Sequence, residues 1–498
     1  MLFVAFATLS CSKKVEVTGN FAGGSPLERV EFIEASGIAT LPLVNLGVDS
    51  KGSFSGSFEA PKNGMYIMAY AGKTAMVYLK GGQKLNISGQ AANFPGQFTI
   101  TGDAKNNNDF LMEIQKFIQT YASKINVGEL VSKKEDQFLK DINKIKSDIS
   151  KNIDDSGKKT SADKEVIEFK KDELDASLLG LLNQYEVAHP QATQNPSYKP
   201  SENFKNLEKE WSKNSERMIK NHPIYRSYLL GKYNTEFQKF QEKNDKTGTA
   251  LYSDLYSKFL DTKKDLPQIT KDYLMAFILA SGDISPETTP ENLKKIDKII
   301  EEKIKDSDIK KDLKRITFVI AGPKMGEAIS SADLTKQDGS SFKLSTATAK
   351  PTMVMFYASW NPYISERTVP VLKEVINFYK SKVDFAFVNL DDTKDQFTKT
   401  SSALMKGIPG TNAYAENGLN SQIAKDLGIY GFKLPSFILI DKNGKIASKL
   451  FYDLGNEETV TALDKISGLK APSVQPQVQL QNDLLAPENQ MPQPAPTK

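Results

Sequence analysis

The chain contains almost no cysteine or histidine. Its 498 residues include one cysteine, Cys11, and two histidines, His189 and His222. One cysteine cannot form a disulfide within the chain, and cysteine-rich zinc sites and paired-thiol chemistry are excluded with it. The histidines are too far apart for the usual metal-ligand spacings, and no serine-hydrolase motif accompanies them. We therefore expect no metal and no other cofactor.

The chain also lacks an excess of either charge. Lysine and arginine number 65 against 61 aspartates and glutamates, which leaves a net charge of +4 with both signs interleaved. Without a basic patch or stripe, we expect no nucleic-acid partner. A length of 498 residues exceeds one ordinary hydrophobic core and predicts roughly two to four domains.

The first apolar run is short and ends at the only cysteine. Residues 1–10 are mostly apolar, and Cys11-Ser12-Lys13-Lys14 follows. A run of this length cannot span a bilayer but matches the apolar part of a secretory signal. A small residue followed by cysteine resembles a bacterial lipoprotein signal, which implies cleavage before Cys11, lipidation of its thiol and anchoring in the cell envelope. We expect the lipid anchor to lie in the outer membrane and the protein to face the periplasm. The alternative is an apolar N-terminus with an incidental cysteine.

Residues 15–104 are expected to form an all-β domain. Apolar and polar residues alternate in short segments that glycine-containing turns separate. The expected strands cover residues 15–19, 29–34, 53–58, 65–70, 75–79 and 84–87. Many short strands at this spacing predict an antiparallel sandwich or open barrel. The motifs Gly52-x-Phe54 and Gly64-x-Tyr66 resemble the all-β domain that opens many Bacteroidetes envelope lipoproteins, which implies an architecture and no activity.

Residues 106–318 are expected to form a helical domain. Apolar residues recur every three or four positions, as between Phe110 and Tyr121, and lysine and glutamate lie between them. Turn-forming residues predict breaks at residues 152–157, 189–200 and 281–290. The aromatic residues from Trp211 to Phe240 are expected in the core, and the alternative is that they line a groove.

The last part, residues 471–498, is rich in proline and glutamine. Such a composition cannot bury a core, so we expect a disordered or extended tail. The apolar Leu484-Leu485-Ala486 within it leaves a docking segment as the alternative.

Residues 322–469 have the pattern of an α/β domain. The apolar strand from Thr352 to Ala358 runs into Ser359-Trp360 and a helix start, and Leu434-Pro435-Ser436 precedes a second apolar strand. These features resemble the thioredoxin superfamily, most closely its TlpA-like and AhpC/TSA-like branch. The resemblance implies a cis peptide bond at Pro435, and a proline of an edge strand is the alternative. The segments together predict a multidomain α+β protein: an N-terminal antiparallel β sandwich or barrel, a helical middle and a C-terminal thioredoxin-like α/β domain.

In active members of that family, two cysteines follow the tryptophan as Cys-x-x-Cys. With the tryptophan as anchor, the two thiol positions fall on Asn361 and Ile364. With Pro370 as anchor, they fall on Pro362 and Ser365, and neither register supplies sulfur. Thiol–disulfide exchange and peroxide reduction both need a thiolate. We therefore expect a redox-inactive domain that is not an enzyme.

The altered site still offers a binding surface. The helix start leaves backbone N–H groups unpaired, and Asn361 is expected to cap it. In the family, backbone beside the cis-proline pairs with an extended peptide, so we expect an envelope protein or peptide to bind here. The expected contact residues are Trp360, Asn361, Pro362, Tyr363, Ile364 and Pro435.

The leading hypothesis is an envelope-anchored lipoprotein whose redox-inactive thioredoxin-like domain binds or scaffolds another protein. One alternative is a thiol–disulfide oxidoreductase or peroxiredoxin relative that acts with a partner's thiol. The other is a domain that only supports the rest of the protein.

Overall fold

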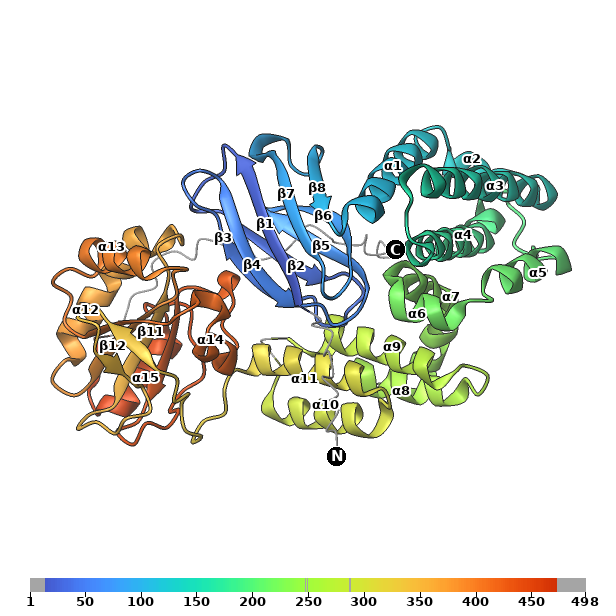
Figure 1. The fold of residues 1–498 in the computed structure, drawn as a ribbon. Helices are drawn as coiled ribbons and strands as arrows, with labels where there is room; N and C mark the ends of the chain where they lie inside the picture. Colours follow the sequence, from blue (N-terminus) through green and yellow to red (C-terminus); the bar gives the residue numbers. More distant parts are fainter. Residues whose placement is uncertain (1–13, 247, 249, 286–287, 473–498) are drawn as a thin grey trace, which may run out of the picture.

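A computed structural model describes residues 14–472, except 247, 249, 286 and 287. The β-rich N-terminal part, drawn in blue, lies between a green helical part and an orange C-terminal α/β part (Figure 1). The predicted multidomain α+β fold is confirmed. Cys11 and the residues after Pro472 lie outside the described part, so the lipoprotein signal and the tail remain predictions.

The N-terminal part is a β sandwich of two four-stranded sheets, with the strand orders β4-β1-β7-β8 and β3-β2-β5-β6. Neighbouring strands are antiparallel except β1 and β7, which run parallel. The strands are β1 (Lys14–Ala22), β2 (Arg29–Glu34), β3 (Pro42–Gly47), β4 (Ser53–Glu59), β5 (Gly64–Tyr70), β6 (Lys73–Leu79), β7 (Lys84–Gln90) and β8 (Phe98–Gly102). The turn η1 (Ala91–Asn93) separates the last two.

Alternation along the strands turns one face of each sheet toward the sandwich core. In β1, Val15 and Val17 are buried whereas Glu16 between them is exposed. Aromatic rings fill the space between the sheets, as where the ring centroids of Phe21 and Tyr70 lie 4.4 Å apart. Offset aromatic contacts of this kind add to the stabilisation that burial of apolar area provides.

The middle part is helical. Its elements are α1 (Lys105–Ala122), α2 (Val127–Ser132), α3 (Glu135–Thr160), α4 (Lys164–Ala192), α5 (Glu202–Trp211), α6 (Ser215–Asn221), α7 (Pro223–Asn244), α8 (Tyr252–Thr262), α9 (Gln268–Ile278), η2 (Leu279–Asp283), α10 (Pro290–Lys303) and α11 (Ser307–Ala321). Because α3 continues through residues 152–157, the break predicted there is wrong. Ile153 and Gly157 are buried, and a β-carbon on Gly157 would meet Ile167 Cδ1 of α4 at 2.5 Å. Close packing against α4 thus overrides the local turn signal.

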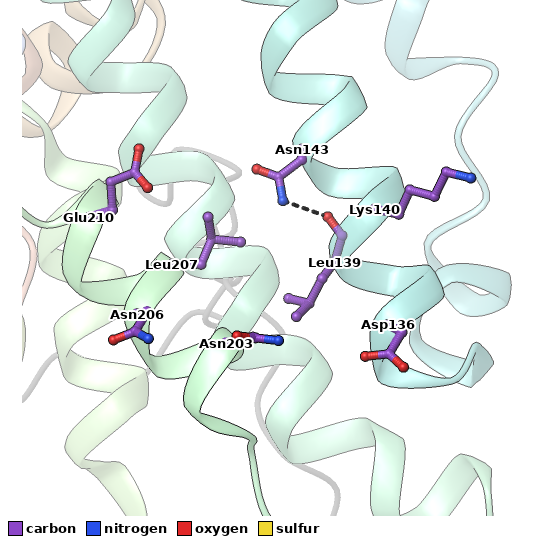
Figure 2. A pocket seen from close by; sticks show the side chains of 8 residues that line it. All are labelled: Asp136, Leu139, Lys140, Asn143, Asn203, Asn206, Leu207 and Glu210. Carbon is purple, nitrogen blue, oxygen red and sulfur yellow. Dashed lines mark hydrogen bonds between the residues drawn. The ribbon is translucent and has the colours of Figure 1, made fainter.

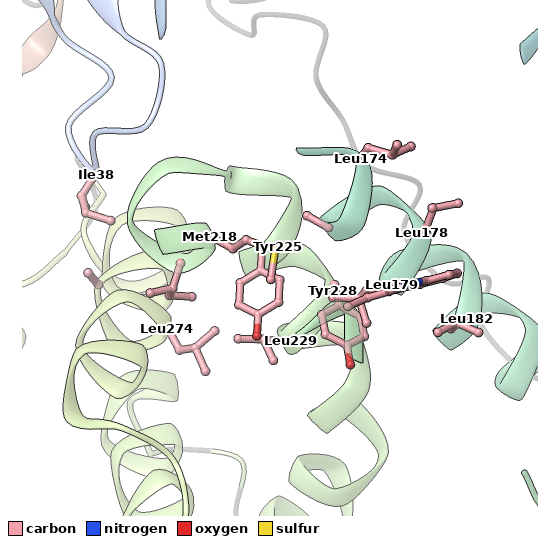
Figure 3. Close-up of a cluster of buried hydrophobic side chains, with 14 of the residues drawn as sticks. Ile38, Leu174, Leu178, Leu179, Leu182, Met218, Tyr225, Tyr228, Leu229 and Leu274 are labelled. Atoms are coloured by element: carbon pink, nitrogen blue, oxygen red, sulfur yellow. The ribbon is translucent and has the colours of Figure 1, made fainter. Parts of the chain in front are cut away.

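The helical part and the sandwich share one hydrophobic core. Ile38, Met65 and Tyr78 of the sandwich belong to the same cluster of buried side chains as the apolar faces of the helices. Figure 3 shows Ile38 on the sandwich side of this cluster, with Met218 and Leu274 on the helical side. A continuous core of this kind fixes the sandwich against the helices.

The C-terminal α/β part has a mixed sheet in the order β10-β9-β13-β12-β11-β14. Its elements are β9 (Leu334–Lys336), β10 (Ser341–Phe342), β11 (Thr352–Tyr357), η3 (Ile364–Thr368), α12 (Val369–Tyr379), β12 (Asp384–Asn389), α13 (Lys394–Leu404), β13 (Thr411–Tyr414), η4 (Gly418–Asn420), α14 (Gln422–Leu427), η5 (Gly431–Lys433), β14 (Ser436–Ile440) and α15 (Glu457–Ser467). Val354 and Phe356 of β11 face the core under α14, whereas Met353 and Met355 face the core under α12. β11 is therefore buried on both faces, as predicted.

His222 joins α6 to α7 and is enclosed by the helices around it. Its side chain is 2% exposed, its ring centroid lies 4.2 Å from that of Phe169, and its Nε2 has no hydrogen-bond partner among the described residues. Burial is the main cause that lowers the pKa of His222 to about 3, and nearby cations such as Lys170 and Arg217 act in the same direction. The imidazole is therefore neutral in the folded protein near neutral pH.

We expect His222 to make the protein less stable in acid. An unfolded chain protonates this histidine at its ordinary pKa of 6.5, whereas the folded chain does so only near pH 3. Since the unfolded state binds the extra proton, lowering the pH from 6.5 towards 3 reduces the free energy of unfolding. The reduction is about 1.4 kcal/mol for each pH unit. Urea unfolding at several pH values should show this slope removed in His222→Gln and kept in His189→Gln. The same slope in both variants would contradict the neutral, buried state.

Candidate functional site

The predicted site residues follow the carboxyl end of β11. The chain turns after Ala358, whose carbonyl accepts a hydrogen bond of 3.1 Å from the N–H of Asn361. β11 itself lies between β12, which runs parallel to it, and β14, which runs antiparallel. Loops that follow the carboxyl ends of parallel strands form the usual binding edge of α/β domains. Residues 359–364 lie at that edge.

Asn361 binds the cis-proline loop. Its Nδ2 donates to the carbonyl of Leu434 over 2.6 Å, and its Oδ1 accepts from the N–H of Tyr363 over 3.0 Å. The Leu434–Pro435 peptide bond is cis, as the family resemblance implies. Pro435 also directly precedes β14, which is an edge strand. Asn361 also caps the start of the helical segment as expected, because its Oδ1 accepts from the N–H two residues further on, although η3 itself begins only after Tyr363.

A π-helical turn explains why two registers are compatible with the sequence. The turn η3 connects the site to α12, and Pro370 lies in the first turn of α12. A π turn contains one residue more than an α turn. Counting from Trp360 and counting back from Pro370 therefore differ by one position. The contact of Asn361 with the cis-proline loop favours the count from Trp360, and we therefore predict that Asn361 and Ile364 occupy the two positions that correspond to the thiols of the family.

The six predicted contact residues differ in their accessibility. Trp360 and Asn361 are each 8% exposed, and Ile364 is fully buried in the core under α12. Pro362 and Tyr363 are exposed, and Pro435 is half-buried. The structure brings all six to one edge of the sheet, but only Pro362, Tyr363 and part of Pro435 face solvent.

The β sandwich covers Trp360. The guanidinium carbon of Arg29, from the start of β2, lies 4.7 Å from the centroid of the Trp360 ring. The same guanidinium is paired with the carboxylate of Asp392, and its Nη2 donates to Oδ1 over 2.7 Å while Nη1 donates to Oδ2. Nε1 of Trp360 is buried without a hydrogen-bond partner in the described part of the chain. The face that bears the thiols in active relatives of the predicted family is here an interface between domains.

A second contact closes the edge of the sandwich. Asn420, in η4, donates from Nδ2 to the carbonyl of Asn45 over 2.9 Å and accepts from the Asn45 N–H over 3.4 Å. At the opposite edge of the same sheet, Asn108 makes the equivalent pair of bonds to the backbone of Tyr78, both at 2.9 Å. β3 and β6 thus keep no open strand edge at these positions, and open edges invite aggregation.

Asp391 holds the start of the site in place. Its Oδ1 accepts from the N–H and the hydroxyl of Ser359 over 2.6 and 2.8 Å. Its Oδ2 accepts from Asn389 and Thr400, each over 2.9 Å. Asp391 is fully buried, and satisfied buried networks of this kind fix one conformation. Of two consecutive carboxylates, Asp391 therefore positions the loop and Asp392 binds the sandwich.

Sequence reasoning predicts none of Arg29, Asp391, Asp392 and Asn420 as site residues. The two aspartates lie just beyond an apolar parallel strand, β12, with one residue between, and that place is a signal that would have indicated them. No local signal marks Arg29, which is 363 residues away from Asp392 along the chain.

Comparison with known proteins agrees with this architecture. Residues 349–446 match the model of a protein family described as thioredoxin-like. The C-terminal α/β part is a thioredoxin-like domain. No curated protein matches the chain.

Several solved structures resemble the thioredoxin-like domain. One is a C-terminal domain named after a thiol–disulfide oxidoreductase of Bacteroides thetaiotaomicron, with 27% identity, 29% of this chain and 97% of that chain covered, and a TM-score of 0.26. A thioredoxin domain of a thiol–disulfide oxidoreductase from Bacteroides vulgatus is 16% identical, and the match covers 29% of this chain and 99% of that chain with a TM-score of 0.25. A thiol–disulfide oxidoreductase from Bacteroides fragilis is 21% identical, and the match covers 28% of this chain and 98% of that chain with a TM-score of 0.24.

Lys433 ties the cis-proline loop to the helical part. Its ammonium donates to the carbonyl of Val319 in α11 and lies 5.5 Å from the centroid of the Tyr452 ring. Burial lowers the pKa of Lys433 to about 8. Because the ammonium is bound to a carbonyl, this residue serves as a structural contact of the thioredoxin-like domain.

Other candidate sites contribute little. Within the described ranges, no group of three or more His, Cys, Asp or Glu side chains is placed to hold a metal ion. No described helix combines the length and apolar character needed to cross a membrane. A cleft of about 380 Å³ lies between α3 and α5 (Figure 2). It is lined mainly by polar side chains: Asp136, Leu139, Lys140, Asn143, Asn203, Asn206, Leu207 and Glu210. None of the predicted site residues lines it.

Proposed function

We propose that this chain is a thiol-independent binding or scaffolding protein of the cell envelope. The observation that carries the proposal is the state of the two former thiol positions. Asn361 is bound to the cis-proline loop and Ile364 is packed into the core. Neither side chain can cycle between a thiolate and a disulfide. The thioredoxin-like domain then acts through its surface.

The exposed part of the former site is the proposed contact surface for a partner. Tyr363 is 45% exposed, and the guanidinium carbon of Arg367 lies 5.2 Å from its ring centroid. Phe432, which lies three residues before the cis-proline, is 54% exposed. Exposed aromatic residues beside a structured loop are typical anchors of protein interfaces. A partner protein or peptide of the envelope would contact Pro362, Tyr363 and Phe432.

We expect Tyr363→Ala to lose this partner. Affinity capture of the tagged full-length protein from its native envelope should recover the partner in stoichiometric amount. The variant should recover roughly tenfold less partner, because it lacks an aromatic anchor of the interface. The control is Tyr252→Ala, which removes an aromatic side chain of similar exposure, 39%, from the helical part. Equal capture by both variants would place the partner elsewhere and contradict this surface.

A second candidate is an oxidoreductase that acts with a partner's thiols. The match of residues 349–446 to the thioredoxin-like family supports it more directly than it supports a redox-inactive module. In that case the partner's two thiols reduce a substrate disulfide and are themselves oxidised. This chain then holds the two proteins together and forms no covalent intermediate, because its site has no sulfur.

The location we propose is the envelope, with a lipid anchor on Cys11. The support is the apolar N-terminal run that ends at the chain's only cysteine. In cells fed a labelled fatty acid, the unmodified protein should carry the label and sediment with membranes. Cys11→Ala should lose both the label and the sedimentation, and a labelled variant would contradict the proposed anchor.

A further inference from the structure

The surface that carries Trp360, Asp392 and Asn420 is called here the former redox face. It binds one guanidinium group both by stacking and by an ion pair. Arg29 lies over the indole of Trp360 and pairs with both carboxylate oxygens of Asp392. Its side chain is 10% exposed and that of Asp392 25%, so the pair is largely shielded from water. A planar group that stacks on an aromatic ring and donates two parallel hydrogen bonds is the geometry of arginine, and a lysine ammonium cannot reproduce it.

The same face also holds the edge of a strand. Asn420 binds the N–H and the carbonyl of Asn45, which are present in any residue except proline at this place. Arg29 is adjacent on β2, since it pairs with Gly47 in β3 and its Nε donates to Asn45 Oδ1 over 2.5 Å. The face therefore binds an arginine together with the backbone of a neighbouring extended strand.

The fit of the sandwich on this face is close. A β-carbon on Gly47 would meet Asp392 Oδ2 at 2.0 Å, so the backbone of β3 approaches the carboxylate as only glycine allows. The sandwich and the thioredoxin-like domain nevertheless have separate apolar cores, and hydrogen bonds and an ion pair join them at this face. One buried donor, Nε1 of Trp360, has no partner among the described residues. Polar interfaces between domains of one chain permit separation more readily than apolar ones.

We propose that the former redox face is an arginine-binding site. Trp360 is its platform, Asp392 its carboxylate, and Asn420 its strand contact. Arg29 occupies it within the chain. An arginine on an exposed pair of strands of a partner protein occupies it when the sandwich and the helical part, which share one core, separate together from the thioredoxin-like domain. This inference rests on the proposed function as a binding module and specifies the chemistry that the module recognises.

The test uses Trp360 as its own reporter. The chain has two tryptophans, so the full-length Trp211→Phe protein retains only Trp360. Arg29→Ala in this background should make Trp360 more accessible to the quencher acrylamide. A β-hairpin peptide with an arginine on one strand and a glycine opposite it on the other, as Arg29 and Gly47 are paired, should then bind and reverse the quenching. The matched peptide with lysine should bind at least about tenfold more weakly, since it loses the bidentate and stacking contacts.

Two further variants make the outcome decisive. Asp392→Asn, combined with Arg29→Ala, should abolish the preference for arginine over lysine. With Arg29 present, the arginine peptide should bind more weakly because the site is already occupied. If Arg29→Ala fails to fold by circular dichroism, Arg29→Lys serves in its place. Equal binding of both peptides, or a preference unchanged by Asp392→Asn, would overturn the arginine site. Neither result concerns redox activity, which tests the proposed function separately.

Discussion

Replacing Asn361 and Ile364 by cysteine is expected to give a pair of thiols that forms a disulfide. Asn361 lies against the cis-proline loop and Ile364 follows it at the start of the helix, as the Trp360 register requires. In a Cys11→Ser background the doubly substituted chain has no other thiol. Titration with Ellman's reagent should find two thiols after reduction and none after mild oxidation. Replacing the buried Ile364 is expected to cost about 1–3 kcal/mol of stability, which leaves the domain folded.

The control for this experiment is the other register. Pro362→Cys with Ser365→Cys, in the same background, should keep two free thiols under conditions that fully oxidise the first pair. Pro362 is exposed and does not contact the cis-proline loop by any hydrogen bond found in the described residues. Disulfide formation by the control pair alone would show that the sequence aligns with the family through Pro370, and would contradict our assignment of the lost thiol positions.

Arg226→Ala is expected to destabilise the protein by about 4 kcal/mol, because it leaves buried carbonyl groups without their donor. The guanidinium of Arg226, 3% exposed in α7, donates to Ile219 O and Ser36 O over 2.8 Å and to Lys220 O over 2.9 Å. It also lies 4.2 Å from the ring centroid of Tyr273. Burial lowers the pKa of Arg226 to about 10, so the group remains charged near neutral pH.

Urea denaturation measures this effect. The loss should include weaker attachment of the sandwich, because Ser36 belongs to the loop after β2 and the other two carbonyls to the end of α6. The control is Arg367→Ala, an exposed arginine of the thioredoxin-like domain, which should change the free energy of unfolding by less than about 0.5 kcal/mol. A similar, small change in both variants would contradict the role assigned to Arg226.

The sequence predicts most elements where the pattern is local. β1 and β2 follow from period-two alternation and α1 from its apolar stripe. β3 is missed because Val44, Asn45 and Leu46 are all buried, so that no alternation remains. These consecutive residues lie between the core of the sandwich on one side and the thioredoxin-like domain on the other.

The candidate site shows more clearly which features local sequence patterns predict and which they do not. Local sequence is sufficient to predict the loss of both thiols, and the cis-proline follows from the family resemblance. It cannot decide between the two registers, because a π turn changes the spacing without a signal in residue type. It also cannot show that Trp360 is covered, since the arginine that covers it comes from the other end of the chain. Contacts between domains depend on how the parts dock, and no periodicity encodes that.

The central claim is that the thioredoxin-like domain has no thiol–disulfide chemistry of its own. The most direct test is insulin reduction by the purified full-length protein with dithiothreitol as the electron donor, beside an active thioredoxin. We predict a rate equal to that of dithiothreitol alone at every protein concentration. A rate that rises in proportion to the concentration of this protein, and persists in Cys11→Ser, would contradict the claim and favour the oxidoreductase.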